Sequence, residues 1–513
     1  MKVKSVLFSI VLSCTAPLYA VKTFSFQEIH EMPQSIEKDY YIWRFLSQKS
    51  TTPPEAKKII EEASHLNKKL STAYRNKTGL APEIKQQPRR MATEEEKARW
   101  KTNYQKLQEL KDSKADYPAW AKENPQIECY LFNNCGTEIR KKKYDKLLNS
   151  KQFRLLSMDK KFNQSIRIIL NEDLPKLRAS LLQPPAHANE ISSDTHFQIG
   201  LFALKQQKED IAMIYFGQAR KKAVKRRDKD QANFWMYLVS KERGYLTNLV
   251  NSHDVNIYTL IARDLLNLRY PKIITPKISR SKVFHYDVLD PIDWAKLKQK
   301  MFSGKYNLND LADTYKSQET VGHYTFIKAK ASDYKESYYP MPYRDAMRNM
   351  SKERQAMIYA IARQESRFVP ASVSRSFALG MMQIMPFLIE DIAKKKNDNI
   401  DLDDLFNPYK AIEYADFHLD YLDKWLYHPL FVAYAYNGGI GFTKKLITNH
   451  QNFRPGRYEP YMSMESMTNV ETREYGKHVL TNYVIYLNTL GVPTRLLPLI
   501  KEVTDPNKTD RFR

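Results

Sequence analysis

The segment SKERQAMIYAIARQESRF, residues 351–368, predicts a helix that carries a charge on its apolar side. Met357, Ile358, Ile361 and Ala362 recur at three- and four-residue spacing, which is one stripe of an amphipathic helix. Glu365 continues that stripe. Because a buried carboxylate is costly to desolvate, such a glutamate is paired with a cation, keeps its proton, or serves a reaction. The segment thus indicates both a helical fold and a candidate functional residue.

The ends of this helix can also be predicted, and the composition extends the helical expectation to the whole chain. Ser351 is a suitable N-cap, and Pro370 indicates that the helix ends near Glu365. Only 14 of the 513 residues are glycine, well below the usual fraction of about 7%. Turn-rich β architectures need more glycine, so we expect an all-α protein. The length suggests two to four domains, at roughly 150 residues each.

The first 20 residues, MKVKSVLFSIVLSCTAPLYA, have the pattern of a secretory signal peptide. Lys2 and Lys4 precede an apolar run, and Ala20 offers a small residue for cleavage. A lipoprotein signal with Cys14 as the lipidated residue is the alternative. No later stretch has the 18 or more continuous apolar residues of a membrane span. We therefore expect an exported, soluble mature protein.

The remaining cysteines, Cys129 and Cys135 in CYLFNNC, are candidates for a disulfide in an oxidising compartment. Two unpaired thiols are the alternative. The sequence has no CxxC pair, no HExxH and no His/Cys cluster, so we expect no metal site and no cofactor.

The net charge indicates an anionic partner. The chain carries +24, and removal of two signal-peptide lysines leaves +24 − 2 = +22. The most basic run is RKKAVKRRDK, residues 220–229. In an exported protein, cell-wall polymer or membrane surface ranks ahead of nucleic acid, which we do not expect as a partner. A solvated helix face explains this run equally well.

Proline-rich breaks divide the chain into three expected domains after the signal peptide (1–20). Residues 21–268 read as successive short helices, for example in HFQIGLFALKQQKEDIAMIYFGQARKKA, and predict an α-superhelical solenoid. Three prolines in residues 269–294 mark a boundary, and residues 269–338 are expected to form a small helical linker domain. A second break near Pro340 opens a compact domain, residues 339–513. Gly438 and Gly439 end a helix there and lack the spacing of a phosphate-binding loop.

Four motifs in the last domain resemble, in order and spacing, those of the soluble lytic transglycosylases that cut bacterial peptidoglycan. They are AIARQESRFVP (360–370), SRSFALGMMQIMP (374–386), AYNGG (435–439) and MESMTNVETREYGKHVL (464–480). The resemblance spans residues 339–490 and implies a lysozyme-like catalytic domain. The two N-terminal regions are similar to the ring-shaped superhelical and linker domains of the large soluble members.

The resemblance implies that Glu365 is the sole catalytic acid and base. It would protonate the glycosidic oxygen between MurNAc and GlcNAc and then deprotonate the MurNAc C6 hydroxyl, giving a 1,6-anhydro product. The apolar stripe suits this role, because burial raises the pKa of a carboxyl toward neutrality. Ordinary glycosidases use two carboxylates. Whether Glu390, Asp391, Asp401 or Asp404 lies near Glu365 stays open.

Further site residues follow from the resemblance position by position. The residues that match family positions in the substrate cleft are Ser374, Gln383, Met385, Tyr436, Asn437 and Glu465. Met385 and Tyr436 could equally be core residues. The chain departs from the family where Phe377 replaces a frequent glycine and where GGIGF follows the Tyr-Asn pair. These departures concern subsite preference.

Three functions are compared. The first is a monomeric periplasmic lytic transglycosylase that acts on peptidoglycan strands and meets cell-wall proteins through its superhelix. The second is a goose-type lysozyme, which hydrolyses the same bond with water. The third is a non-catalytic wall-binding scaffold, which the intact Glu365, Gln383, Tyr436 and Asn437 disfavour.

Overall fold

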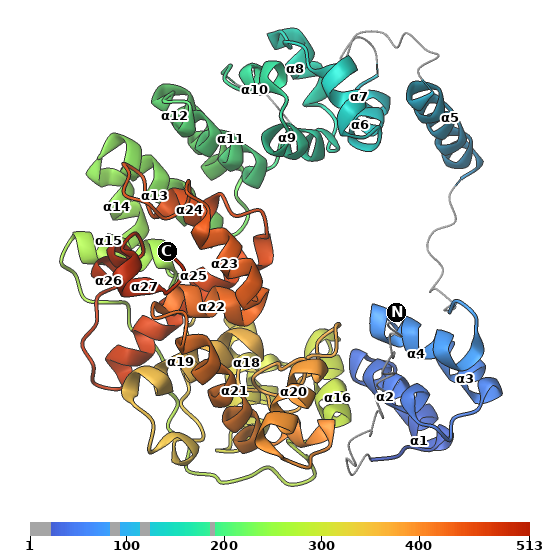
Figure 1. Ribbon diagram of the computed structural model, residues 1–513. Helices are drawn as coiled ribbons and strands as arrows, with labels where there is room; N and C mark the ends of the chain where they lie inside the picture. The colour runs from blue at the N-terminus through green and yellow to red at the C-terminus, as the bar shows by residue number, and fades with distance from the viewer. Residues whose placement is uncertain (1–21, 83–92, 113–123, 185–189) are drawn as a thin grey trace, which may run out of the picture.

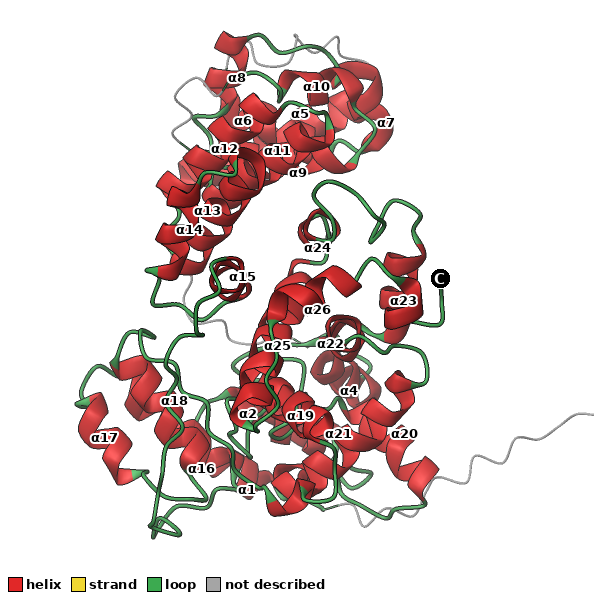
Figure 2. Ribbon diagram, turned by 90° about the vertical axis from the view of Figure 1, so that its left-hand side faces the viewer, coloured by secondary structure: helices red, strands yellow, loops and turns green. Residues whose placement is uncertain are grey.

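The computed structural model describes residues 22–82, 93–112, 124–184 and 190–513 (Figure 1). Within these ranges the chain forms helices joined by loops, with a few isolated β-bridges and no strand (Figure 2). The predicted all-α class is therefore confirmed. None of the described helices is long and apolar enough to cross a membrane. The predicted signal peptide, residues 1–20, lies outside the described residues.

Four helices open the described chain and pack against its C-terminal part (Figure 1). They are α1 (Phe26–Glu31), α2 (Ile36–Ser47), α3 (Pro53–Ile60) and α4 (Lys68–Thr78). Thr52 caps α3, and Pro53 and Pro54 occupy its first turn, where a missing N–H costs nothing.

A series of helices follows and arches from the N-terminal group to the opposite side of the molecule (Figure 1). They are α5 (Glu94–Lys111), α6 (Pro125–Asn134), α7 (Thr137–Ile139), the π-helical turn η1 (Arg140–Tyr144), α8 (Ser150–Leu156), α9 (Phe162–Asn171), α10 (Pro175–Ser180), α11 (Ser193–Lys205), α12 (Glu209–Lys222), α13 (Arg226–Ser240), α14 (Arg243–Val250) and α15 (Ile257–Leu265). α11 and α12 pack closely because Gly200 leaves room for the Phe216 ring. The successive short helices predicted from the sequence are present in the described ranges.

The last part of the chain contains two further groups of helices. The first is α16 (Pro291–Phe302), α17 (Leu308–Thr314) and α18 (Val321–Ala331). The second is η2 (Asp345–Met347), α19 (Lys352–Glu365), α20 (Pro386–Lys396), η3 (Leu402–Phe406), α21 (Pro408–Asp423), α22 (Pro429–Gly438), α23 (Ile440–Thr448), α24 (Tyr461–Glu465), α25 (Val470–Thr489), α26 (Leu496–Glu502) and α27 (Pro506–Thr509). As predicted, Ser351 caps α19, which ends at Glu365.

The centre of the second group is α25, against which both α19 and α22 pack (Figure 2). Gly476 allows this approach, because a Cβ at that position would collide with the ring of Tyr434. One hydrophobic cluster runs from Phe24 through α11–α15 to Val503, while a second one holds residues 107–215 together. The first of these clusters contains residues on both sides of positions 269 and 339. The domain boundaries at these positions therefore stay predictions.

The expected disulfide between Cys129 and Cys135 is not formed, and that prediction is wrong. Both residues are buried free thiols. Cys129 lies within α6 and Cys135 directly follows its last residue. Six residues of helix separate two Cα atoms by about 9 Å along the axis, which exceeds the span that a disulfide can bridge. Burial raises the pKa of the Cys129 thiol to about 12, so it stays protonated.

Candidate active site

Glu365 is the last residue of α19, and its helix is held firmly in place. Ile361 and Ala362 of its stripe are fully buried. The next residue, Ser366, donates a hydrogen bond of 2.7 Å from Oγ to the carbonyl of Met381, which ties the end of α19 to the following loop. The carboxyl group of Glu365 therefore projects from a rigid element rather than a loop.

The two arginines beside Glu365 are directed to other partners. Arg363 donates to Oδ1 of Asn482 at 2.7 Å, and its guanidinium lies over the Tyr339 ring at 3.9 Å. Arg367 lies over the ring of Phe326. No ion pair reaches Glu365 in the part of the chain that the structure describes, so no cation compensates its charge.

The surroundings of Glu365 favour its protonated form. Burial raises the pKa of Glu365 to about 8, and the negative charge of Glu471 acts in the same direction. Tyr475 opposes them: its hydroxyl donates a hydrogen bond of 2.7 Å to Oε1 of Glu365, which lowers this pKa by favouring the carboxylate. The result is a carboxyl that holds its proton near neutral pH and has a donor ready for its ionised form.

Tyr436 and Asn437, at the end of α22, lie close to this group. The hydroxyl of Tyr436 donates to the carbonyl of Met382 at 2.9 Å. Burial and the negative charge of Glu365 raise the pKa of Tyr436, so it stays a neutral phenol. Oδ1 of Asn437 accepts a hydrogen bond of 2.8 Å from Thr472 in the first turn of α25. The ends of α19, α22 and α25 thus meet at one place.

Ser374 and Gln383 shape the loop that faces α19. Oγ of Ser374 accepts a hydrogen bond of 2.9 Å from the backbone N–H of Ala378. Nε2 of Gln383 donates to the carbonyls of Ser372 and Gly380, at 3.0 and 2.8 Å. Both side chains therefore form hydrogen bonds with the backbone of the loop and stabilise its conformation.

Met385 lies at the other side of this loop, directly before the first residue of α20. It lines a groove of about 840 Å³ together with Trp43 and Phe387. Phe387 is 63% exposed, so the groove presents an aromatic surface to solvent. The wall opposite the loop comes from α2 and α4, a contribution that the sequence did not predict.

Phe377, the departure from the family pattern, joins the N-terminal helices to this loop. Its ring stacks on Trp43 with a centroid distance of 5.6 Å and contacts the edge of Tyr40 at 5.9 Å. Its backbone has φ +63°, a conformation for which glycine is the usual residue. The side chain is 1% exposed, so burial of its ring offsets that strain. Phe377 therefore anchors α2 rather than reshaping the cleft rim.

One of the acids left open in the sequence, Asp401, strengthens the same contact together with its neighbour Asp403. Asp401 and Asp403 form ion pairs with Arg44 of α2 at 2.6 and 2.8 Å. Asp391 pairs with Lys395 on α20. These partners lie on α2 and α20, away from the contacts of Glu365. The second carboxylate near Glu365 is instead Glu471, on α25.

Glu465 is not brought together with the other site residues. It is 1% exposed and forms a buried network with Lys477 at 3.0 Å, Gln231 at 2.9 Å and the hydroxyl of Tyr258. Gln231 and Tyr258 belong to α13 and α15, within the region 21–268 that the sequence predicts to be superhelical. Since both carboxylate oxygens of Glu465 are engaged, it ties the superhelix to α25.

Glu471 and Tyr475 are the functional candidates that the sequence reasoning missed. They stand four residues apart on α25, which places them on one helix face. Both fall within the quoted stretch MESMTNVETREYGKHVL. The four-residue spacing of these two side chains was the one sequence signal for a shared helix face. It could not show that this face of α25 contacts Glu365.

Comparisons with known proteins agree with this geometry. The family model of the transglycosylase SLT domain matches residues 342–457. The soluble lytic murein transglycosylase of Salmonella typhimurium is 29% identical over 177 residues, which cover 33% of this chain and 27% of that protein. The protein of the same name from Escherichia coli K12 is 29% identical over 171 residues, covering 32% and 26%. The matches thus span about a quarter of these relatives.

Solved structures extend the likeness of fold over most of the chain. An inactive mutant of the lytic transglycosylase Slt from Pseudomonas aeruginosa aligns with a TM-score of 0.51 at 15% identity, covering 90% of this chain and 74% of that one. The 70-kDa soluble lytic transglycosylase in complex with bulgecin A aligns with a TM-score of 0.51 at 17% identity, covering 91% and 83%. Glu365 and Tyr436 both lie inside the region that the family model matches. Residues 342–457 of this chain therefore match the transglycosylase SLT domain, and the likeness to the solved structures is one of fold.

Proposed function

We propose that this protein is a peptidoglycan lytic transglycosylase that cleaves the MurNAc–GlcNAc β-1,4 bond without water. The observation that carries the proposal is the state of Glu365, a carboxyl on the end of a buried helix with a pKa raised to about 8. It lies within an SLT domain, and the relatives of that region are named soluble lytic murein transglycosylases.

In the first step, protonated Glu365 donates its proton to the glycosidic oxygen, and the bond from that oxygen to the anomeric carbon breaks. A general acid works best when its pKa lies near the working pH, which a carboxyl with an ordinary pKa of 4.5 does not achieve. Burial supplies the missing shift.

In the second step, the carboxylate left on Glu365 removes the proton of the MurNAc C6 hydroxyl, whose oxygen attacks the anomeric carbon. This closes the 1,6-anhydro ring and returns the proton to Glu365, so the enzyme is restored. Tyr475 donates to Oε1 throughout and stabilises the carboxylate between the two steps. Tyr436 keeps its proton and offers a fixed polar surface beside the carboxyl.

Hydrolysis is the second candidate, and Glu471 is the observation that favours it. This exposed acid is close enough for its charge to raise the pKa of Glu365. A glycosidase of the two-carboxylate type would use such a group to activate a water. The two reactions give products that differ by one water molecule.

We further propose that Tyr436, Asn437 and Met385 contact the sugar, that the protein acts as a monomer in the periplasm, and that its basic surface meets the anionic peptides of the wall. The net charge of +24 supports the last point.

The test is the mass of fragments released from purified peptidoglycan by the mature protein, with Glu365→Gln beside it. We expect muropeptides lighter by one water than hydrolysis products, and none from the variant. Full-mass products would establish hydrolysis and direct attention to Glu471. Absence of products from both proteins would refute catalysis and favour the scaffold.

A further inference from the structure

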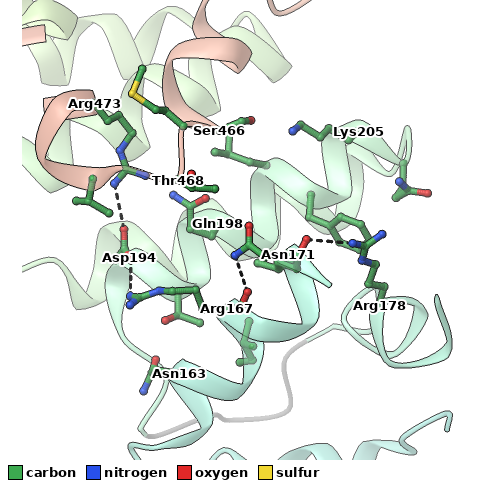
Figure 3. Close-up of a pocket in the computed structure, with 18 of the residues that line it drawn as sticks. Asn163, Arg167, Asn171, Arg178, Asp194, Gln198, Lys205, Ser466, Thr468 and Arg473 are labelled. Atoms are coloured by element: carbon green, nitrogen blue, oxygen red, sulfur yellow. Dashed lines mark hydrogen bonds and ion pairs between the residues drawn. The ribbon is translucent and has the colours of Figure 1, made fainter. Parts of the chain in front are cut away.

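A second pocket lies between the superhelix and the beginning of α25 (Figure 3). It encloses about 390 Å³, and its walls come mainly from α9, α10, α11 and residues 466–473. Pockets of this size hold ligands of a few residues or rings. No contact of Glu365 is part of its lining, so it is separate from the candidate active site.

The pocket is lined by an excess of positive charge. Its charged residues are Arg167, Arg178, Lys205, Arg473 and Asp194. Asp194 is shared between Arg167 at 3.6 Å and Arg473 at 3.7 Å (Figure 3). Arg178 donates to the backbone carbonyls of Ile169 and Leu170. Neither Arg178 nor Lys205 has a carboxylate within 4.0 Å among the residues that the structure describes. A carboxylate-bearing ligand would complete this arrangement.

Two buried polar atoms of the lining also lack partners. Nε2 of Gln198 and Oγ of Ser466 are buried, and neither forms a hydrogen bond within the described ranges. Leaving such groups unpaired is costly, and a ligand with amide or hydroxyl groups would satisfy them. Gln198 is central among the labelled residues of the pocket (Figure 3).

The pocket is connected to the active site through α25. Thr468 and Val470 line it, and Val470 is the first residue of α25. Tyr475, which donates to Glu365, lies on the next turn of that helix. A ligand in this pocket therefore contacts the segment that positions the donor of the catalytic carboxyl.

We propose that this pocket binds the carboxylate-bearing peptide stem of a peptidoglycan strand. The assignment rests on the proposed function, because it takes the strand that Glu365 would cut as the source of the peptide. Arginine and lysine side chains recognise the carboxylates, while Gln198 and Ser466 pair with amide groups of the peptide backbone. The pocket thereby selects strands that still carry their stems.

Binding tests the assignment without turnover. The full chain carrying Glu365→Gln is titrated calorimetrically with a synthetic stem tetrapeptide and with the same peptide amidated at its carboxylates. Adding Arg178→Gln and Lys205→Gln should weaken binding of the free acid about tenfold. Lys221→Gln combined with Lys225→Gln removes the same two charges at exposed positions outside the pocket and is the control. Gln198→Leu removes one amide partner without changing charge and serves if the double variant misfolds.

The outcomes separate this proposal from the proposed function. Equal affinity in the pocket variants and the control, or equal affinity for the amidated peptide, would overturn it. In the active chain, the ratio of kcat/KM for peptide-bearing to peptide-free strands should fall about tenfold in the double variant. If the chain binds the free acid but releases no sugar, the proposed function fails and the pocket assignment stands. A double variant that keeps the wild-type ratio would show that the bound peptide is a free fragment rather than a strand stem.

Discussion

Replacing Tyr475 by phenylalanine should move the pH dependence of the reaction upward. The hydroxyl of Tyr475 donates a hydrogen bond of 2.7 Å to Oε1 of Glu365, and this bond lowers the pKa of Glu365 against the effect of burial. Tyr475→Phe removes the hydroxyl donor and keeps the ring. The hydrogen bond then no longer offsets the rise in the pKa of Glu365 that burial causes. The protonated form of Glu365 then persists to higher pH.

The magnitude follows from the strength of that bond. A hydrogen bond to a charged group contributes about 1.5–3 kcal/mol, and about 1.4 kcal/mol corresponds to one pKa unit. The pKa of Glu365, about 8 in the wild type, should therefore rise by about one to two units in the variant. Because the acid form starts the reaction, activity is present below this pKa and is lost as the pH rises through it.

The assay is kcat/KM for release of soluble muropeptides between pH 5 and pH 10, in the wild type and in Tyr475→Phe. Tyr434→Phe is the matched control: the hydroxyl of Tyr434 is buried and has no hydrogen-bond partner within the described chain. We expect the basic limb to shift upward in Tyr475→Phe alone. A basic limb that stays in place, or that moves to lower pH, would refute the role given to this bond.

Three further predictions concern stability. Glu365→Gln should be more stable than the wild type by about 2–4 kcal/mol at pH 9, and nearly equal to it in stability at pH 4. The reason is that the raised pKa of Glu365 stabilises the wild-type fold fully below pH 4.5, and this stabilisation is lost as the pH rises through about 8. Denaturant unfolding at both pH values checks this, and a stability difference that does not change with pH contradicts it. Phe377→Ala should lower the free energy of unfolding by about 3–5 kcal/mol, because it leaves a cavity beside Trp43. Denaturant unfolding measures this loss, and limited proteolysis shows whether α2 is released. A loss of less than about 1 kcal/mol would contradict the anchoring role of Phe377. Arg44→Met should cost about 3–5 kcal/mol by removing the cation that pairs with Asp403 at 2.8 Å. The loss should be smaller at pH 4, because burial raises the pKa of Asp403 and less of its charge is then left without a partner. Unfolding at pH 4 and pH 7 measures both values, and an equal loss at both would contradict the ion-pair explanation.

Local features of the fold could be read from the sequence because they depend on neighbours along the chain. The start of α19 at Ser351 and its end at Glu365 follow from a capping side chain and an apolar period. The start of α3 at Thr52 and Pro53 is a second example. Each of these signals lies within a few residues of the structure that it specifies.

Features that depend on distant contacts were missed or misjudged. Glu465 matched a cleft position by motif, yet Gln231 and Tyr258 of the superhelix enclose it. The pair Cys129 and Cys135 had a suitable count and compartment, but the geometry of α6 keeps the thiols apart. The hydrogen-bond partners of Glu465 and the separation of the two thiols are both set by the folded structure. Neither can be read from the residues that are adjacent in the sequence.

The sequence by itself determined that the chain is helical, that Glu365 stands on an apolar stripe, and that the last domain carries the motifs of a transglycosylase. Periodicity and motif order carry that information because they are local. Only the tertiary structure decided that α25 brings Tyr475 to Glu365 and that α2 packs on Phe377. The pKa of Glu365 depends on desolvation by the surrounding helices, so it exists as a property of the folded protein alone.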